Sequence, residues 1–378
     1  MNALLRAAGL SIAALGLLSG CSDDKPTAAT DAGVEDAGSQ KPILTGKLGA
    51  AVAAAESGTG QAAAQKAPGD GPPEAGFFPP GGADKAQPPG APAKVEVLSD
   101  GADPKVQLVL TPPSEQQVRV TGGYRAGGQQ GGGLPVFEYG VSLKVEKAKG
   151  KDEKEAKADS VQVQAKVTSV TIPGAAGKLP KELSDGLDKL KNADIRYRLT
   201  SDGSMLDLTA SLPKDKEKDK NPEIAPLLEL ALRGLVESLT QVTVPLPKKP
   251  VGVGGYWIAT DRSTSFGIEV VRYRVFKVQK IEKDLATLSI DTRQYAVKDE
   301  LDLGAIVQNQ KIVAERFDSQ GKGTLTWKGA ELVSSTSDLT QRTQVAIGGG
   351  PKGGPPKGGL MVELSAKTSE LEKTDKKK

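Results

Sequence analysis

Apolar and polar residues alternate through most of residues 94–371, and this pattern restricts the chain to a β-rich fold. The clearest run has apolar side chains at every second position from Phe137 to Val145, with polar or small residues between them. Side chains on a strand point to opposite faces in turn, so a strand with one buried face shows a period of two. Repetition of the pattern over so long a region predicts a mostly antiparallel sheet.

Two departures from the alternation carry further information. Apolar residues occupy alternate positions from Val161 to Val167, and the pattern then shifts by one residue before Val170. An extra residue in one strand of a pair causes such a shift, so we expect a β-bulge there. Residues 201–204 (Ser-Asp-Gly-Ser) separate two alternating runs and have the composition of a tight turn. They predict a hairpin over residues 195–212.

One helix is expected to be buried on nearly all sides. From Ile224 to Leu239, apolar residues cover almost the whole helical circumference, and Asn221 is the expected N-cap. A helix with one face in water would instead show an apolar stripe. A shorter amphipathic helix is expected over Leu183–Lys191. The predicted fold is therefore mainly β with one or two helices (α+β), in which a curved, mostly antiparallel sheet, or half-barrel, wraps around the apolar helix.

Composition changes sharply near residue 94. Ala, Gly and Pro make up forty of the 72 residues from 22 to 93. Such a segment has too few large apolar side chains to offset the entropy lost on ordering. We therefore expect residues 21–93 to form a disordered tether in which Phe77-Phe78 is incidental. Residues 94–371 are assigned to the β-rich domain and residues 372–378 to a charged tail.

Residues 1–20 have the parts of a secretory signal peptide. Arg6 precedes the mainly apolar stretch Ala7–Leu18, whose 12 residues are fewer than the about 20 that a membrane-spanning helix needs. Small residues then lead to the only cysteine of the chain, in Leu18-Ser19-Gly20-Cys21. This sequence resembles the lipobox of bacterial lipoproteins.

The lipobox resemblance implies an address for the protein. It implies cleavage between Gly20 and Cys21 and attachment of several acyl chains at Cys21, which together would hold the chain stably at a membrane. In many lipoproteins, Asp directly after the cysteine retains the protein in the inner membrane, whereas here Ser22 stands at that position. We therefore expect a lipid-anchored protein of the cell envelope, at the outer membrane and facing the periplasm.

Composition excludes several kinds of chemistry. The chain has no histidine, which excludes imidazole bases, triads that contain histidine and histidine ligands to zinc. A single cysteine excludes an internal disulfide. The 50 Lys and Arg nearly balance the 47 Asp and Glu, so the chain lacks the basic character of nucleic-acid-binding proteins. Without a catalytic, cofactor-binding or metal-binding motif, we expect a protein that is not an enzyme and has no cofactor, metal or nucleic-acid partner.

A junction rich in proline and glycine, Pro247–Trp257, follows the apolar helix. It matches the pattern P-x-x-P-V-x-x-G-x-x-W and resembles a junction in a family of uncharacterised, exported, β-rich bacterial proteins. The predicted layout is also similar to that of half-barrel lipoprotein carriers, in which a curved sheet holds a helix and a lipid-sized cavity. The second resemblance concerns architecture alone, and a fold by itself does not define a function.

Three functions remain open from the sequence. We expect Leu228, Leu232 and Leu235 to be buried under the sheet near Trp257, and these residues are the candidates to line a cavity for a lipid or other apolar ligand. An envelope protein is the other candidate partner. A structural or scaffolding lipoprotein without a ligand is the alternative, and a hydrolase that uses carboxylates alone is the third. A cavity of several hundred Å³ between the helix and the sheet favours the first, a filled interior the second, and converging carboxylates with raised pKa values the third.

Overall fold

The computed structural model describes residues 76–127, 135–146, 160–175, 179–213, 224–302, 311–347 and 358–371. The expected signal peptide, Gly20, Cys21, Asn221 and the charged tail lie outside these residues. The described residues form three helices, α3 (Gly82–Ala86), α4 (Lys181–Leu190) and α5 (Ala225–Gln241). They also form thirteen strands: β1 (Lys94–Ser99), β2 (Glu115–Gly127), β3 (Phe137–Glu146), β4 (Ser160–Thr171), β5 (Asp194–Thr200), β6 (Met205–Ser211), β7 (Tyr256–Ser265), β8 (Ile268–Glu282), β9 (Leu285–Ala296), β10 (Glu300–Asp302), β11 (Lys311–Lys328), β12 (Thr336–Ile347) and β13 (Gly358–Glu370).

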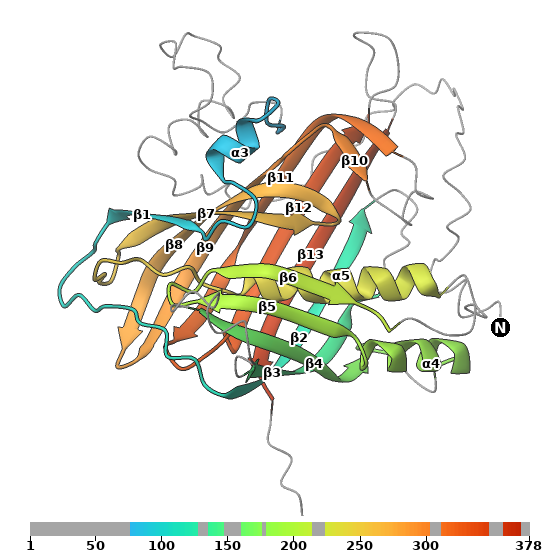
Figure 1. Cartoon of the computed structure of the whole chain (residues 1–378), viewed down its shortest axis with the longest axis horizontal. Helices are drawn as coiled ribbons and strands as arrows, with labels where there is room; N and C mark the ends of the chain where they lie inside the picture. The colour runs from blue at the N-terminus through green and yellow to red at the C-terminus, as the bar shows by residue number, and fades with distance from the viewer. Residues whose placement is uncertain are drawn as a thin grey trace, which may run out of the picture.

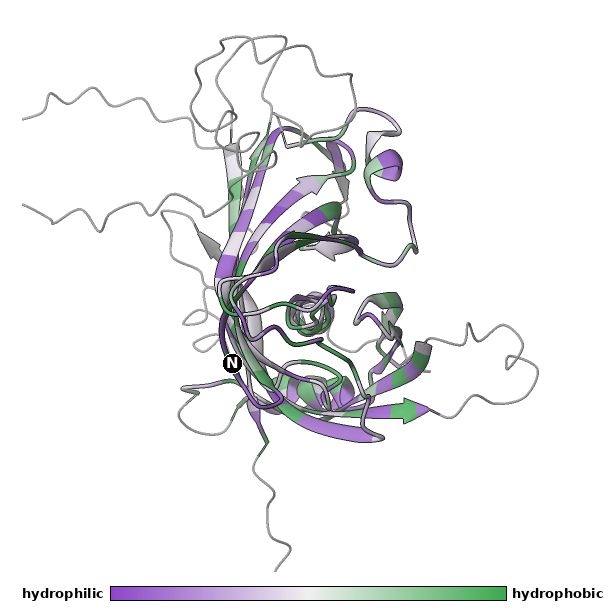
Figure 2. Ribbon diagram, turned by 90° about the vertical axis from the view of Figure 1, so that its left-hand side faces the viewer, coloured by the Kyte–Doolittle hydropathy of each residue, from purple (hydrophilic) through white to green (hydrophobic). Residues whose placement is uncertain are grey.

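The strands form one open, antiparallel sheet. Its order is β1-β7-β8-β9-β11-β12-β13-β2-β3-β4-β5-β6, and β10 pairs with β11 beside this path. The sheet curves strongly, with β1 and β6 at its two ends (Figures 1 and 2). Helix α5 lies in the hollow, and it is seen end-on in Figure 2. The predicted fold class, a curved, mostly antiparallel sheet around an apolar helix, is confirmed.

Helix α5 packs against the middle of the concave face. Leu235 and Leu239 are fully buried there, and the Tyr139 hydroxyl on β3 donates a hydrogen bond to the Ala231 carbonyl on α5. A Cβ at Gly122 on β2 would come within 2.4 Å of the Ser238 hydroxyl oxygen on α5. Glycine at this strand position therefore allows the close approach of the helix backbone.

The expected local irregularities of the sheet are confirmed. The register of β3 with β4 shifts between the pairs Gly140–Ser169 and Val141–Val167, where the sequence predicts a bulge. Strands β5 and β6 pair as a hairpin across residues 201–204, as expected from the turn composition. Helix α4 begins two residues before the expected start, and α5 begins at Ala225, one residue after the first apolar position.

The folded part of the chain begins before residue 94. Residues 76–93, which composition assigns to the disordered tether, pack against the sheet and include α3. Phe77 forms a bridge with Ala296 at the end of β9, and Phe78 is buried against Tyr295. The Phe77-Phe78 pair is therefore not incidental, because it fixes this segment to the sheet. Composition misses the segment because a few anchoring side chains are enough once a folded surface is available.

Helix α3 covers the outer face of the sheet, opposite α5. Ala83 on α3 packs with Val271 and Tyr273 of β8, whose neighbours Arg272 and Arg274 point to the concave face. Each strand alternates its side chains between the two faces, so this position on the convex side follows from the sequence of β8. None of the helices among the described residues has the length and apolar character needed to cross a membrane.

We predict that Leu235→Ala lowers the free energy of unfolding by about 2–5 kcal/mol, because it removes fully buried methyl groups and leaves a cavity. Leu98→Ala on β1 is the matched control, since 38% of Leu98 is exposed and its loss should cost at most about 0.5 kcal/mol. Urea denaturation of both variants measures the difference. Equal costs for the two changes would contradict a central position of α5 in the core.

Candidate binding site at the seam of the sheet

A belt of buried polar side chains crosses the concave face between two apolar clusters. One row runs through the paired residues Asp261, Arg272, Gln294, Ser319 and Thr343, on β7, β8, β9, β11 and β12. The next row along the strands contains Arg274, Thr292, Gly321 and Gln341. We call these nine residues the polar belt. On β8 the belt has Val270 on one side and Phe276 on the other, and these side chains belong to separate apolar clusters.

In the part of the polar belt on β9, β11 and β12, buried polar side chains form hydrogen bonds with one another. The Ser319 hydroxyl donates to Gln294 Oε1 at 3.0 Å and lies 2.7 Å from the Thr343 hydroxyl. Gln341 Nε2 donates to the Ser319 oxygen at 2.8 Å. Buried polar groups are costly unless they are paired in this way. Ser319 therefore joins three strands across the middle of the belt.

Two buried arginines bind the C-terminal end of α5. Arg274 Nη1 donates to the carbonyl oxygens of Thr243 at 2.7 Å and Thr240 at 3.3 Å, and Arg272 Nη2 also reaches the Thr240 carbonyl at 3.3 Å. The last carbonyls of a helix have no partner within the helix and carry partial negative charge. The arginines thus supply both the donors and the opposite charge that this buried helix end needs.

Asp261 on β7 is the counter-ion of both arginines. Its Oδ1 accepts from Arg272 Nε at 2.9 Å, and its Oδ2 accepts from Arg272 Nη2 at 3.0 Å and Arg274 Nη2 at 2.6 Å. Burial alone would raise the pKa of Asp261, but the charges of Arg272 and Arg274 outweigh it and hold the pKa below the ordinary value. Burial, together with the nearby charge of Arg272, lowers the pKa of Arg274 to about 10, so Arg274 stays charged at neutral pH.

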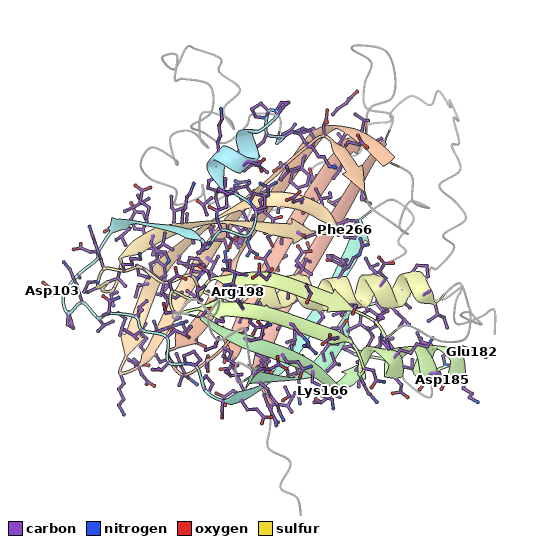
Figure 3. All side chains as sticks on the ribbon, viewed as in Figure 1. Asp103, Lys166, Glu182, Asp185, Arg198 and Phe266 are labelled. Carbon is purple, nitrogen blue, oxygen red and sulfur yellow. The ribbon has the colours of Figure 1, made fainter. Side chains whose placement is uncertain are left out.

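Glu237, near the C-terminal end of α5, joins the helix to β2 and to the turn between β7 and β8. Its Oε2 accepts hydrogen bonds from the Tyr124 hydroxyl on β2 at 2.7 Å and from the Phe266 backbone N–H at 2.8 Å. Its Oε1 accepts from the Ser265 hydroxyl at 2.8 Å. Phe266 occupies the turn between β7 and β8, close to α5 (Figure 3). Burial raises the pKa of Glu237, and the three donors partly oppose this shift.

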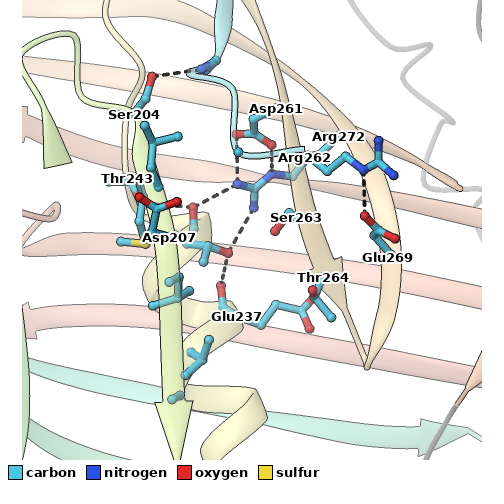
Figure 4. Close-up of a pocket in the computed structure, with 18 of the residues that line it drawn as sticks. Ser204, Asp207, Glu237, Thr243, Asp261, Arg262, Ser263, Thr264, Glu269 and Arg272 are labelled. Carbon is cyan, nitrogen blue, oxygen red and sulfur yellow. Dashed lines mark hydrogen bonds and ion pairs between the residues drawn. The ribbon is translucent and has the colours of Figure 1, made fainter. Parts of the chain in front are cut away.

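A cavity of about 840 Å³ opens beside these buried charges, between the two ends of the sheet (Figure 4). We call it the seam cavity. Its wall on β6 is mainly apolar, with Met205, Leu206 and Leu208, whereas its wall on β7 and β8 is polar and charged. That second wall consists of Asp261, Arg262, Ser263, Thr264, Glu269, Arg272 and Arg274. Helix α5 contributes both kinds of side chain, including Val236 and Arg233.

Contacts at the edge of the seam cavity connect the elements that surround it. The Ala93 backbone N–H donates to the Ser204 hydroxyl at 3.1 Å, which joins the start of β1 to the turn before β6. Arg262 forms ion pairs with Glu269 at 2.8 Å and with Asp84 on α3 at 2.5 Å. The Ala93–Ser204 contact therefore joins the two ends of the sheet, and the ion pairs of Arg262 tie the β7 wall to β8 and α3.

The sequence-based candidates lie in the core and not at the cavity. Leu228, Leu232, Leu235 and Trp257 belong to one buried cluster, and none of them lines the seam cavity. The Trp257 ring stacks on Phe276 at 5.4 Å, and its Nε1 donates to the Pro245 carbonyl at 2.9 Å. The structure thus brings the four candidates together, as expected of core residues, and places the cavity on another side of α5.

Sequence reasoning missed the charged residues of the site, although a signal for them exists. Ile268, Val270, Phe276 and Val278 alternate on one face of β8, and Arg272 and Arg274 interrupt this series in the same phase. Charged side chains in the phase of a buried face need a buried partner. Glu237 gives a similar signal, because it falls within a helix whose apolar residues cover almost the whole circumference.

Among the described residues, no three acidic, histidine or cysteine side chains gather as metal ligands would. No protein-family model matches the chain, and no curated protein matches it in sequence.

We predict that Asp261→Asn destabilises the fold by about 3–5 kcal/mol, because it leaves Arg272 and Arg274 buried without a counter-ion. Asp338→Asn is the matched control, since Asp338 forms an exposed ion pair with Lys367 on the convex face and should change stability little. Denaturant unfolding at pH 7 compares the two variants with the wild type. A cost no larger than that of the control would contradict the role of Asp261.

The effect of Asp261→Asn should depend on pH in a defined direction. The folded-state pKa of Asp261 is lowered, so its ionisation stabilises the fold above the unfolded-state pKa of about 4. This contribution disappears as the pH falls through the folded-state pKa. The difference in free energy of unfolding between the wild type and Asp261→Asn should therefore shrink below about pH 4. A constant difference between pH 7 and pH 3 would contradict the ion-pair explanation.

Proposed function

We propose that the protein is a lipid-anchored binding protein of the bacterial cell envelope, held at the outer membrane by acyl chains on Cys21, and that it is not an enzyme. The observation that supports binding is the seam cavity. Its volume falls within the range of about 300–1,000 Å³ that is typical of ligand sites. The lipobox-like sequence supports the anchored location, and no nucleic-acid partner, metal or cofactor is part of the proposal.

The lining of the seam cavity favours an amphipathic ligand over a purely apolar one. Leu206 and Leu208 offer apolar surface on β6, while Arg233 on α5 and Glu269 on β8 line the cavity with charged side chains that are partly exposed. A hydrocarbon chain that filled the whole cavity would remove these charges from water without giving them new partners, which is costly. A ligand with one apolar and one hydrogen-bonding side matches both walls.

One observation favours carboxylate-dependent hydrolysis as a second candidate. Glu237 and Asp261 both line the seam cavity, and their surroundings shift their pKa values in opposite directions. A raised and a lowered carboxyl pKa in one cleft is the arrangement that many hydrolases use. The donors Tyr124, Ser265 and Phe266 already occupy Glu237, however, and the two arginines occupy Asp261. Structural roles therefore account for both carboxylates.

We predict that Cys21→Ser abolishes incorporation of labelled palmitate and moves the protein from the membrane fraction to the soluble fraction. The thiol is the acceptor of the lipid in the proposed anchor, and a hydroxyl at this position cannot replace it. Ser22→Ala, at the neighbouring residue, serves as a control that should retain the label. Equal labelling of the wild type and Cys21→Ser would contradict the anchor.

We predict that the purified chain carries a ligand in the seam cavity. Native mass spectrometry should reveal an added mass that denaturation releases. Ser263→Trp should strongly reduce the fraction with this added mass, because Ser263 lines the cavity and an indole would fill it. Ser369→Trp, on an exposed position of β13, should leave the fraction unchanged. Absence of any added mass from the wild type would favour the scaffolding alternative.

A further inference from the structure

The seam between the two ends of the sheet is only half closed. Strand β1 pairs with the first half of β7, and the register runs from Ser99–Tyr256 to Lys94–Thr260. Beyond Thr260, the residues Asp261–Ser265 pair with β8 on one side and with no described strand on the other. The outer edge of β6 likewise has no described strand beside it. The seam cavity lies between these two strand edges (Figure 4).

Strands β6 and β7, whose edges border the seam cavity, run in the same direction. Ten successive pairings lead from β7 through the sheet to β6, and all of them are antiparallel. An even number of reversals returns the original direction, so β6 and β7 run alike on the two sides of the cavity. One extended segment that runs opposite to both would therefore be antiparallel to each of its neighbours. The gap has the polarity that a single additional strand requires.

The residues directly before β1, which the structure describes, do not occupy this strand position. Continuation of β1 towards the N-terminus from Lys94 would place residues 89–93 opposite Asp261–Ser265 of β7. Two of these residues, Pro89 and Pro92, lack the backbone N–H that a sheet ladder needs. The segment instead turns away, and Gln87 Nε2 donates to the Pro92 carbonyl at 2.9 Å. Pro89, Gly90 and Ala91 reach only the lining of the cavity.

We propose that the ligand of the seam cavity is an extended segment of a partner polypeptide, which inserts as a strand between β6 and the Asp261–Ser265 half of β7. This inference rests on the proposed binding function and specifies its ligand. The free half of β7 sets the length at about five residues, or about 17 Å. Main-chain hydrogen bonds to both edges supply most of the affinity, as in other cases of strand addition.

The walls of the cavity also define the side chains of the segment. Alternate residues of an inserted strand face the hollow, where Leu206 on β6 and Val236 on α5 offer apolar contacts. The intervening residues face outward to solvent. The segment therefore has small or medium apolar side chains at every second position and polar ones between them. Such a strand is itself amphipathic, in agreement with the two unlike walls of the cavity.

The test uses two peptide probes and the full-length chain carrying Cys21→Ser. One probe has the sequence of β1, Lys-Val-Glu-Val-Leu-Ser, which already pairs with β7, and the other alternates Thr and Val over the same length. We expect saturable binding of both in fluorescence anisotropy. Versions of each peptide with N-methyl groups at alternate backbone nitrogens keep the side chains but lose the N–H donors along one edge of the peptide strand. Methylation of either edge should weaken binding at least about tenfold, because two or three hydrogen bonds are lost.

Hydrogen exchange and cavity variants locate the bound probe. Bound peptide should slow exchange in β6 and in the Asp261–Ser265 half of β7 together, and this measurement needs no variant. Ser263→Trp should weaken binding at least about tenfold by filling the strand position, while Ser369→Trp should bind as the wild type does. Thermal unfolding of both variants checks that they are folded.

The possible results distinguish failure of strand insertion from failure of the proposed binding function. Failure of both probes to bind, equal binding of N-methylated probes, or protection of a single edge would overturn strand insertion. If native mass spectrometry nevertheless shows a lipid whose binding Ser263→Trp removes, the binding function stands with a lipid as the ligand. If neither peptide nor lipid binds at Ser263, both proposals fail and the scaffolding alternative remains.

Discussion

The burial of one helix end inside a curved sheet is the constraint on which this structure depends. The terminal carbonyls of α5 lie in the hollow, where they need donors that the helix cannot provide. Arg272 and Arg274 provide them from β8, and the two charges in turn require Asp261 on β7. The position of α5, the polarity of the concave face and the unequal walls of the seam cavity all follow from this one requirement.

Buried polar contacts of Glu237 and of two arginines in the polar belt also fix the register of the helix against the sheet. An apolar helix on an apolar surface could slide or rotate at little cost, since apolar contacts have no direction. Glu237 and the two arginines hold the C-terminal part of α5 in place, so its apolar residues meet a defined set of partners. Buried polar groups thus select one arrangement from several that hydrophobic packing alone would allow.

The sequence predicted the sheet and its helix because these elements depend on local periodicity. The bulge near Val167, the hairpin across residues 201–204 and the buried helix from Ile224 were all visible as changes of phase or period. The site was not predicted, because the buried phase of Arg272 and Arg274 on β8 indicates that they need a partner but does not identify it, and Asp261 becomes that partner only when β7 pairs with β8. Residues 76–93 were misassigned for a related reason. These residues are ordered because Phe77 and Phe78 dock on the sheet near β8 and β9, and the composition of the segment itself gives no information about that surface.

The docking of Phe77 and Phe78 has a mechanical consequence. A force applied to the chain before residue 76 first loads the bridge from Phe77 to Ala296 and the buried ring of Phe78, both near the end of β9. Strand β1, which borders the seam, is loaded only after these contacts and the α3 contacts have been broken. As long as the contacts of Phe77, Phe78 and α3 remain intact, a force on the N-terminal part of the chain is therefore not transmitted to β1 or to the seam cavity.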